Sequence, residues 1–157
     1  MAAGKSTRTY PLTLTKPKPL LKVANKTILE HNLDNLNGIV DEIILIVGYK
    51  KNLIIKRFGN RYKNLKIIYA EQKQQLGTAN ALSAAERHIK GRFILMAGDD
   101  IYSREDIKHC AKYNYSILTA KTKNPQIFGV IVEKIGILVN FVEQPKKFIS
   151  NLISTSL

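Results

Sequence analysis

Apolar residues alternate along the chain between continuous runs and helical stripes. Continuous apolar runs of this length predict strands that are buried on both faces of a sheet. The predicted strands cover residues 42–47, 65–69, 92–97 and 115–120. Elsewhere apolar residues recur with the spacing of one helix face. The predicted helices cover residues 27–36, 52–58, 78–89 and 104–112, the last with Ser103 as its N-cap.

The alternation of strands and helices predicts a Rossmann-like α/β fold. Such a fold has three layers, α/β/α, around a mixed sheet of mostly parallel strands. Near the end of the chain the pattern changes, because residues 129–133 and 137–143 flank a turn at 134–136. This arrangement predicts a C-terminal β-hairpin. No repeat and no internal boundary is visible, so residues 1–157 are predicted to form one domain.

Composition excludes some classes of protein. The sequence has no apolar run of about eighteen residues, which excludes a transmembrane helix. Its N-terminus lacks the apolar core of a signal peptide. The single cysteine, Cys110, has no partner for an internal disulfide. These observations predict a cytoplasmic protein without a membrane partner.

The chain is strongly basic, with 25 lysines and arginines against 12 acidic residues and a net charge of +13. A basic surface favours nucleic acids, anionic membranes or phosphorylated small molecules. The lysines are scattered, and no nucleic-acid-binding motif accompanies them. Nucleic acid is therefore disfavoured as a partner, although a basic RNA-binding module remains one alternative.

The first residues form a candidate phosphate-binding loop. Ala2, Ala3 and Gly4 have small side chains, which allow main-chain N–H groups to approach an anion. Lys5 and Arg8 add positive charge. The loop lacks a buried strand before it, and the chain stops where another strand is expected. The domain is therefore predicted to be incomplete at both ends.

The segment Gly4-Lys5-Ser6 could instead end a P-loop, which requires a helix directly after it. Pro11, Pro17 and Pro19 exclude that helix, because proline in a helix interior costs about 3 kcal/mol. An extended arm is expected instead. It places Lys18 between two prolines, which limit the freedom of the backbone around its ammonium group.

The motif Ala-Ala-Gly-x-x-Thr-Arg at residues 2–8, followed by Pro-Lys-Pro at 17–19, resembles the signature of sugar-1-phosphate nucleotidylyltransferases. This family includes glucose-1-phosphate thymidylyltransferase and UDP-N-acetylglucosamine pyrophosphorylase. The resemblance implies that residues 1–157 are a nucleotidyltransferase domain. It also implies that Arg8 contacts the triphosphate, that Lys18 contacts phosphate at the reacting centre, and that Ala2, Ala3, Gly4 and Lys5 bind the nucleotide.

Two later segments complete the predicted nucleotide site. Gln72 can both donate and accept hydrogen bonds, which suits the imide edge of uracil or thymine. Together with Gly77 and Thr78 it resembles the base-binding segment of the family. Gly98 and Asp99 follow the predicted strand 92–97, and ligands bind at the carboxyl ends of strands in open α/β sheets. Asp99 resembles the family's magnesium ligand, so Mg²⁺ is the implied cofactor.

The sugar side of the resemblance depends on two short segments. Gly129 follows Phe128 as in the family's sugar-binding segment, and Glu143 matches a glutamate that binds sugar hydroxyls. Gln144 stands where the thymidylyltransferase branch has a lysine that contacts the sugar phosphate.

The implied reaction is nucleotidyl transfer from UTP or dTTP to a sugar 1-phosphate, with release of pyrophosphate. Arg8, Lys18 and Asp99 are the predicted catalytic residues. The predicted partners are these two substrates and, for a full-length form, further copies of the chain. The alternative is a truncated or degenerate domain that binds nucleotide without turnover.

Overall fold

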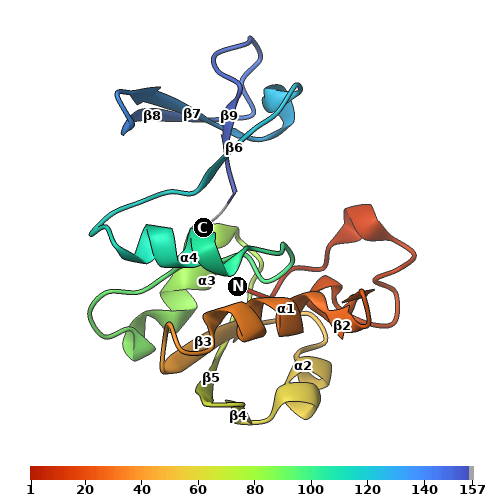
Figure 1. Cartoon of the computed structure of the whole chain (residues 1–157). Helices are drawn as coiled ribbons and strands as arrows, with labels where there is room; N and C mark the ends of the chain where they lie inside the picture. Colours follow the sequence, from red (N-terminus) through yellow and green to blue (C-terminus); the bar gives the residue numbers. More distant parts are fainter. Residues whose placement is uncertain (156–157) are drawn as a thin grey trace. The chain divides into compact units, whose positions relative to one another are not determined.

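The computed structural model describes residues 1–155, except for the side chain of Arg8. The chain divides into two compact units, Met1–Lys108 and His109–Leu157 (Figure 1). The strands of the first unit are β1 (Lys22–Val23), β2 (Lys26–Thr27), β3 (Glu42–Val47), β4 (Arg61–Tyr62) and β5 (Leu65–Glu71). Its helices are α1 (Ile28–Leu36), α2 (Lys51–Phe58) and α3 (Thr78–Ala85), and α4 (Arg104–Ala111) crosses the boundary.

The main sheet of the first unit has the strand order β3-β5-β4. β3 and β5 are parallel, in a register that runs from Glu42 opposite Lys66 to Val47 opposite Glu71. β4 is antiparallel to β5. The two strands predicted over residues 42–47 and 65–69 are thus confirmed, and the second continues to Glu71.

The four predicted helices are confirmed with small changes at their ends. α1 begins at Ile28 because Thr27 forms a capping box with Glu30, in which each side chain bonds the other's main-chain N–H. Ser103 accepts a hydrogen bond from the N–H of Asp106, as expected for the N-cap of α4. The third predicted helix ends early, at Ala85, and continues as the 3-10 helix η3 (Glu86–His88).

α3 packs against one face of β3 and β5 through small side chains. Ala81 and Ala85 of the helix lie in a buried cluster with Ile46 and Ala70 of the strands. Ala3 belongs to the same cluster and is 4% exposed. Because alanine allows close approach, this packing holds the start of the chain beside the sheet.

The strand predicted over residues 92–97 is wrong for the described chain, since this segment forms no ladder. Residues 92–97 are connected to the main sheet by the start of the chain. The nitrogen of Met1 donates to the carbonyl of Met96. Ala2 in turn forms a parallel bridge with Val47 of β3. A strand requires a paired neighbour over several residues, and only the short stretch at residues 1–3 lies between β3 and residues 96–98.

The second unit contains an antiparallel sheet with the order β6-β9-β7-β8. Its strands are β6 (Thr119–Lys121), β7 (Gly129–Lys134), β8 (Ile137–Glu143) and β9 (Leu152–Ser154). The predicted hairpin is confirmed as β7 and β8. The strand predicted over residues 115–120 is shorter and shifted, because the ladder with β9 covers residues 119–121.

Asp34 of α1 joins three side chains from other elements. Its carboxylate accepts hydrogen bonds from Lys26, Tyr62 and Lys63. Burial raises the pKa of Asp34, but these hydrogen bonds outweigh it and lower the pKa from 3.8 to about 2. The ionised carboxylate is therefore favoured by the folded state.

Replacing Asp34 by asparagine should lower the free energy of unfolding at pH 7 by roughly 1–2 kcal/mol, after allowance for the exposed lysine partners. Because folding lowers the pKa, the contribution is complete above about pH 4 and disappears as the pH falls toward 2. Urea unfolding at pH 7 and pH 3 measures this difference. Asp41→Asn, at an exposed position, is the control. Equal acid sensitivity in Asp34→Asn and the unsubstituted chain would contradict the assignment.

Candidate active site

The first four residues lie at the carboxyl end of β3. The N–H of Ala2 donates to the carbonyl of Ile46 at 2.7 Å, and the N–H of Tyr49 donates to the carbonyl of Ala3 at 3.0 Å. On the other side, the N–H of Gly98 donates to the carbonyl of Met1 at 2.6 Å. The predicted phosphate loop therefore starts from a position that is fixed on both sides by main-chain hydrogen bonds.

The loop becomes exposed directly after Ala3. Gly4 and Lys5 are exposed, and a Cβ at Gly4 would meet nothing within 4 Å. The left-handed backbone that small residues favour occurs at Ser6, with φ of 50°, and not at Gly4. The hydroxyls of Thr9 and Thr13 donate to the carbonyl of Ser6 and stabilise this turn. The prediction for the side chain of Arg8 lies outside the described part of the chain.

Lys18 lies in the 3-10 helix η2 (Lys18–Leu20), between the buried residues Pro17 and Pro19. Its Nζ donates to Oδ2 of Asp99 at 3.0 Å, across 81 positions of sequence. Oδ1 of Asp100 lies 3.9 Å from the same ammonium group. The structure thus brings together two of the three predicted catalytic residues.

Asn32 of α1 holds the segment that carries the two aspartates. Its side chain is buried, donates to the carbonyl of Asp100 at 2.7 Å and accepts from the N–H of Tyr102 at 3.3 Å. Sequence reasoning missed this residue. The available signal was a polar side chain one turn after Ile28 on the apolar face of the helix.

Asp100 lies in an environment that disfavours its charge. Burial raises the pKa of its carboxyl, the charge of Asp99 raises it further, and Lys18 lowers it. Two neighbouring carboxylates repel each other, so an added cation beside them is favourable. Among the described residues, no group of three or more histidine, cysteine or acidic side chains is placed to hold a metal. Asp99 and Asp100 are nevertheless the one or two carboxylates that Mg²⁺ bound to phosphate oxygens would need from the protein.

The predicted base-binding residues lie between β5 and α3. Gln72 is 7% exposed, and its Nε2 donates to the carbonyl of Gly77. Gly77 is the N-cap of α3, with φ of 94°, and Thr78 is the exposed first residue of the helix. The side chain of Gln75 donates to the carbonyl of Ala3 at 3.0 Å. This contact connects the base-binding segment to the phosphate loop.

The two predicted sugar-binding residues meet in the second unit. Gly129 of β7 and Glu143 of β8 are directly opposite in the hairpin register. A Cβ at Gly129 would lie 2.7 Å from Cε2 of Phe141 and 3.0 Å from Oε2 of Glu143. Glycine at this position therefore leaves room for the side chains of the neighbouring strand.

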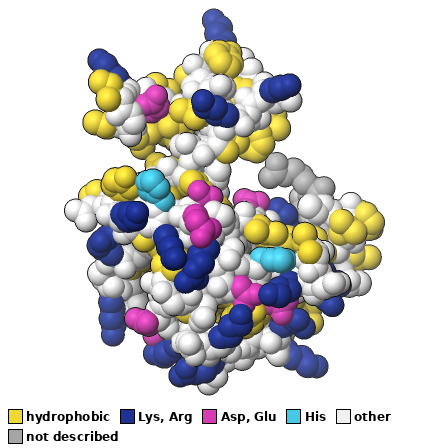
Figure 2. Space-filling view, in the orientation of Figure 1, with side chains coloured by type: hydrophobic (Ala, Val, Ile, Leu, Met, Phe, Trp, Pro, Cys, Tyr) yellow, Lys and Arg dark blue, Asp and Glu magenta, His cyan; other side chains and the backbone are white. Residues whose placement is uncertain are grey.

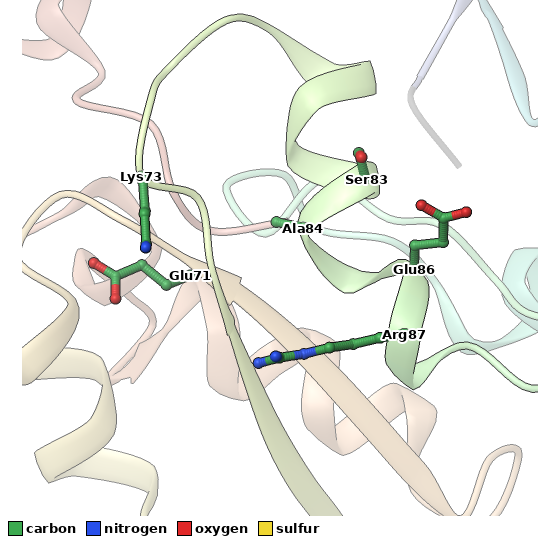
Figure 3. Close-up of a pocket in the computed structure, with 6 residues that line it drawn as sticks. All are labelled: Glu71, Lys73, Ser83, Ala84, Glu86 and Arg87. Carbon is green, nitrogen blue, oxygen red and sulfur yellow. The ribbon is translucent and has the colours of Figure 1, made fainter.

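An open cavity of about 680 Å³ lies outside the predicted site. Its lining residues are Glu71, Lys73, Ser83, Ala84, Glu86 and Arg87, none of which was predicted to bind substrate. Figure 3 shows Arg87 extending from η3 toward β5, the strand that ends at Glu71. Two carboxylates balance two cationic groups here, so the cavity does not concentrate positive charge for a phosphate.

The basic residues are dispersed over the face shown in Figure 2, where lysine and arginine side chains form no single patch. In the part of the chain that the structure describes, no helix combines the length and apolar character needed to cross a membrane. On that face, the dispersed charge gives no support to an extended nucleic-acid surface.

Gly98→Ala should destabilise the protein by about 1–3 kcal/mol, because the new methyl group has no free space. The added Cβ would lie 2.5 Å from the carbonyl oxygen of Met1 and 3.2 Å from the Cβ of Ala2. Gly4→Ala is the matched control, since its Cβ would enter open space. Urea unfolding measures both, and an equal effect of the two changes would contradict the steric explanation.

Comparison with known proteins decides the family. A family model described as nucleotidyl transferase matches residues 1–157. The chain belongs to the nucleotidyl transferase family. Bifunctional protein GlmU from Methanococcus vannielii is 38% identical over an alignment that covers 100% of this chain and 39% of that protein. The nucleotidyl transferase chain thus spans about two fifths of the length of that curated relative.

A second relative is matched over more of its length. UTP–glucose-1-phosphate uridylyltransferase AglF from Haloferax volcanii is 35% identical, with coverage of 99% of this chain and 68% of that protein. A crystal structure from Bacillus anthracis, described as a glucose-1-phosphate thymidylyltransferase in complex with a sucrose, superimposes with a TM-score of 0.86. It shares 23% identity, and the match covers 99% of this chain and 67% of that one. The predicted Rossmann-like α/β fold is confirmed.

Proposed function

We propose that this nucleotidyl transferase chain transfers a nucleotidyl group from UTP or dTTP to a sugar 1-phosphate and releases pyrophosphate. The observation that carries the proposal is the 3.0 Å contact between Lys18 and Asp99. It joins an ammonium group from the proline-rich arm to a carboxylate beside the phosphate loop. A cation for phosphate and a carboxylate for a metal are the groups that this reaction requires.

The reaction brings two anions together, because an oxygen of the sugar phosphate attacks the α-phosphorus of the nucleotide. Negative charge then builds up on the departing pyrophosphate. Positioning and cationic groups supply most of the catalysis in such transfers, and no covalent enzyme intermediate is needed. In the proposed mechanism Lys18 binds the attacked phosphate and Arg8 binds the leaving group.

The remaining predicted residues have binding roles in this proposal. The loop residues Ala2, Ala3, Gly4 and Lys5 bind the nucleotide together with Gln72, Gly77, Thr78 and Gly98. Gly129 and Glu143 bind the sugar. The side chains of Ala2 and Ala3 pack into the core, so in this proposal they contact the nucleotide through main-chain groups other than the Ala2 N–H, which donates to Ile46.

Asp99 is the proposed ligand of Mg²⁺, with Asp100 beside it. When bound, magnesium would neutralise phosphate charge. In the structure Lys18 contacts Asp99, so in this proposal bound nucleotide would attract the ammonium group and would leave the carboxylate to hold the ion. Asn32 keeps the aspartate segment in place through its bonds to Asp100 and Tyr102.

Two measurements on the purified chain test the proposed function. Calorimetric titration with UTP and dTTP in the presence of Mg²⁺ measures binding. Pyrophosphate release with glucose 1-phosphate, N-acetylglucosamine 1-phosphate and other sugar 1-phosphates measures turnover. The proposal expects both binding and turnover for at least one pair. If none of the sugar 1-phosphates tested gave pyrophosphate release, the proposed reaction would be rejected.

The second candidate function is nucleotide binding without turnover. The observation that favours it is Gln144, a neutral amide that cannot supply the charge of the lysine expected there. Binding of UTP or dTTP without pyrophosphate release would select this candidate. Restoration of turnover by Gln144→Lys would identify the missing charge as the cause.

A further inference from the structure

The carboxamide of Gln72 has a fixed orientation. Its Nε2 lies 3.1 Å from the carbonyl oxygen of Gly77 and 3.0 Å from Oδ1 of Asn80. A main-chain carbonyl only accepts hydrogen bonds, so the Gln72 atom that faces it must be the nitrogen. The NH₂ group has two hydrogens, and these two acceptors use both. No donor of the Gln72 side chain remains for a ligand.

The group that remains is the oxygen Oε1 of Gln72. Within the described part of the chain it accepts no hydrogen bond. The Gln72 oxygen is also accessible to solvent. Among the described side chains, Asn37 Oδ1 is the only polar atom that is both fully buried and without a hydrogen-bond partner. A ligand that covers the Gln72 oxygen must therefore offer a hydrogen-bond donor, since an acceptor covered without one is unfavourable.

Gly77, whose carbonyl accepts from Gln72, leaves an open position in the chain. A Cβ at Gly77 would meet nothing within 4 Å. Gln75, from the same segment, contacts the carbonyl of Ala3 in the phosphate loop. The segment thus has an open position next to Gln72 and a direct connection to the loop proposed to bind phosphate.

The geometry points to Asn80 as a positioning residue that sets base selectivity. By accepting the second N–H of Gln72, Asn80 leaves the carboxamide as an acceptor only. The chain therefore favours bases with a ring N–H, namely uracil, thymine and guanine, over cytosine and adenine. This inference rests on the proposed nucleotide site and refines it, because Gln72 alone could either donate or accept.

Uracil and cytosine provide the sharpest comparison. The two rings have nearly the same size, but uracil carries an N–H donor at N3, where cytosine carries a bare acceptor. An acceptor that faces N3 bonds uracil and repels cytosine. A site built around such a bond discriminates strongly against a base that lacks the donor, by at least about tenfold.

The experiment compares UTP and CTP binding to the purified chain by calorimetric titration with Mg²⁺ present. Asn80→Leu keeps the size of the side chain and removes the acceptor, whereas Asn80→Asp keeps an acceptor. Asn80→Ala is a second test without an acceptor, in case leucine disturbs folding. Asn52→Ala, at an exposed position of α2, is the matched control. Circular dichroism checks the folding of each variant.

Asn80→Leu and Asn80→Ala should lower the ratio of UTP to CTP affinity about fivefold, the change expected when one hydrogen bond is lost. Asn80→Asp should keep the ratio within about twofold, because its added charge weakens both nucleotides alike. The control should not change the ratio. An equal loss of UTP and CTP affinity in Asn80→Leu would show a merely structural role and would overturn the inference.

Failure of the inference differs from failure of the proposed reaction. Nucleotide binding with the expected ratios but without pyrophosphate release would reject the reaction and support the role of Asn80. Normal turnover with an unchanged ratio of UTP to CTP affinity in the Asn80 variants would support the reaction and reject the role of Asn80. Absence of all nucleotide binding by the unsubstituted chain would overturn both.

Discussion

Replacing Lys18 by methionine should slow pyrophosphate release by about 10²–10³-fold, the scale of losing one preorganised charged donor. Methionine keeps most of the length and apolar stem of lysine and removes the ammonium group. Pro17 and Pro19 pack in the protein on both sides of Lys18, so the backbone position should persist. The measurement is the rate of pyrophosphate release at saturating UTP or dTTP and sugar 1-phosphate.

Lys16→Met is the control for this change, because Lys16 lies in the same arm and is exposed. It should keep the rate within about twofold, as expected for a surface substitution. Thermal unfolding of both variants checks that the fold is retained. A rate loss below about threefold in Lys18→Met would exclude the proposed role of the ammonium group.

Asp99→Asn should also slow pyrophosphate release by about 10²–10³-fold, because a neutral amide is a poor ligand for a hard cation. The variant should need a higher magnesium concentration for half-maximal rate, which a purely structural change would not require. The amide keeps the size of the carboxylate. It also weakens the ion pair with Lys18, which is only partly buried and contributes little to stability.

Asp41→Asn is the control for Asp99→Asn, since Asp41 is an exposed aspartate between α1 and β3. It should change neither the rate nor the magnesium dependence. If Asp99→Asn slowed the reaction but kept the magnesium dependence unchanged, the proposed metal ligand would be wrong. The carboxylate would then have to act through Lys18 alone.

The elements that could be predicted are those with a strong local signal. The apolar run 42–47 and the stripe over 28–36 each determine one element, because burial of those side chains favours one periodicity. The hairpin of β7 and β8 has two apolar runs and a short turn with Gly136. The rule that a continuous apolar run forms a strand failed for residues 92–97. An apolar run becomes a strand only when a neighbour pairs with its main chain, and composition does not report the neighbour.

In the candidate site too, single residues could be predicted from local motifs, whereas their contacts with distant residues could not. Lys18 and Asp99 were predicted separately, each from its own short motif, but no motif says that they lie 3.0 Å apart. Asn32 escaped notice because its partners are main-chain groups of Asp100 and Tyr102, 68 and 70 positions away. Sequence patterns report the chemistry of a side chain more readily than its distant partners.

The sequence by itself was enough to predict the α/β class, and it indicated a candidate phosphate loop and residue types suited to phosphate, base and metal. Local periodicity and short motifs carry that information. Tertiary structure alone decided which groups of those residues remain available to a ligand. Gln72 can donate and accept in isolation, but Gly77 and Asn80 use its donors and leave an acceptor. A hydrogen-bonding group has a limited number of hydrogens and lone pairs, and folding determines which of them are already used.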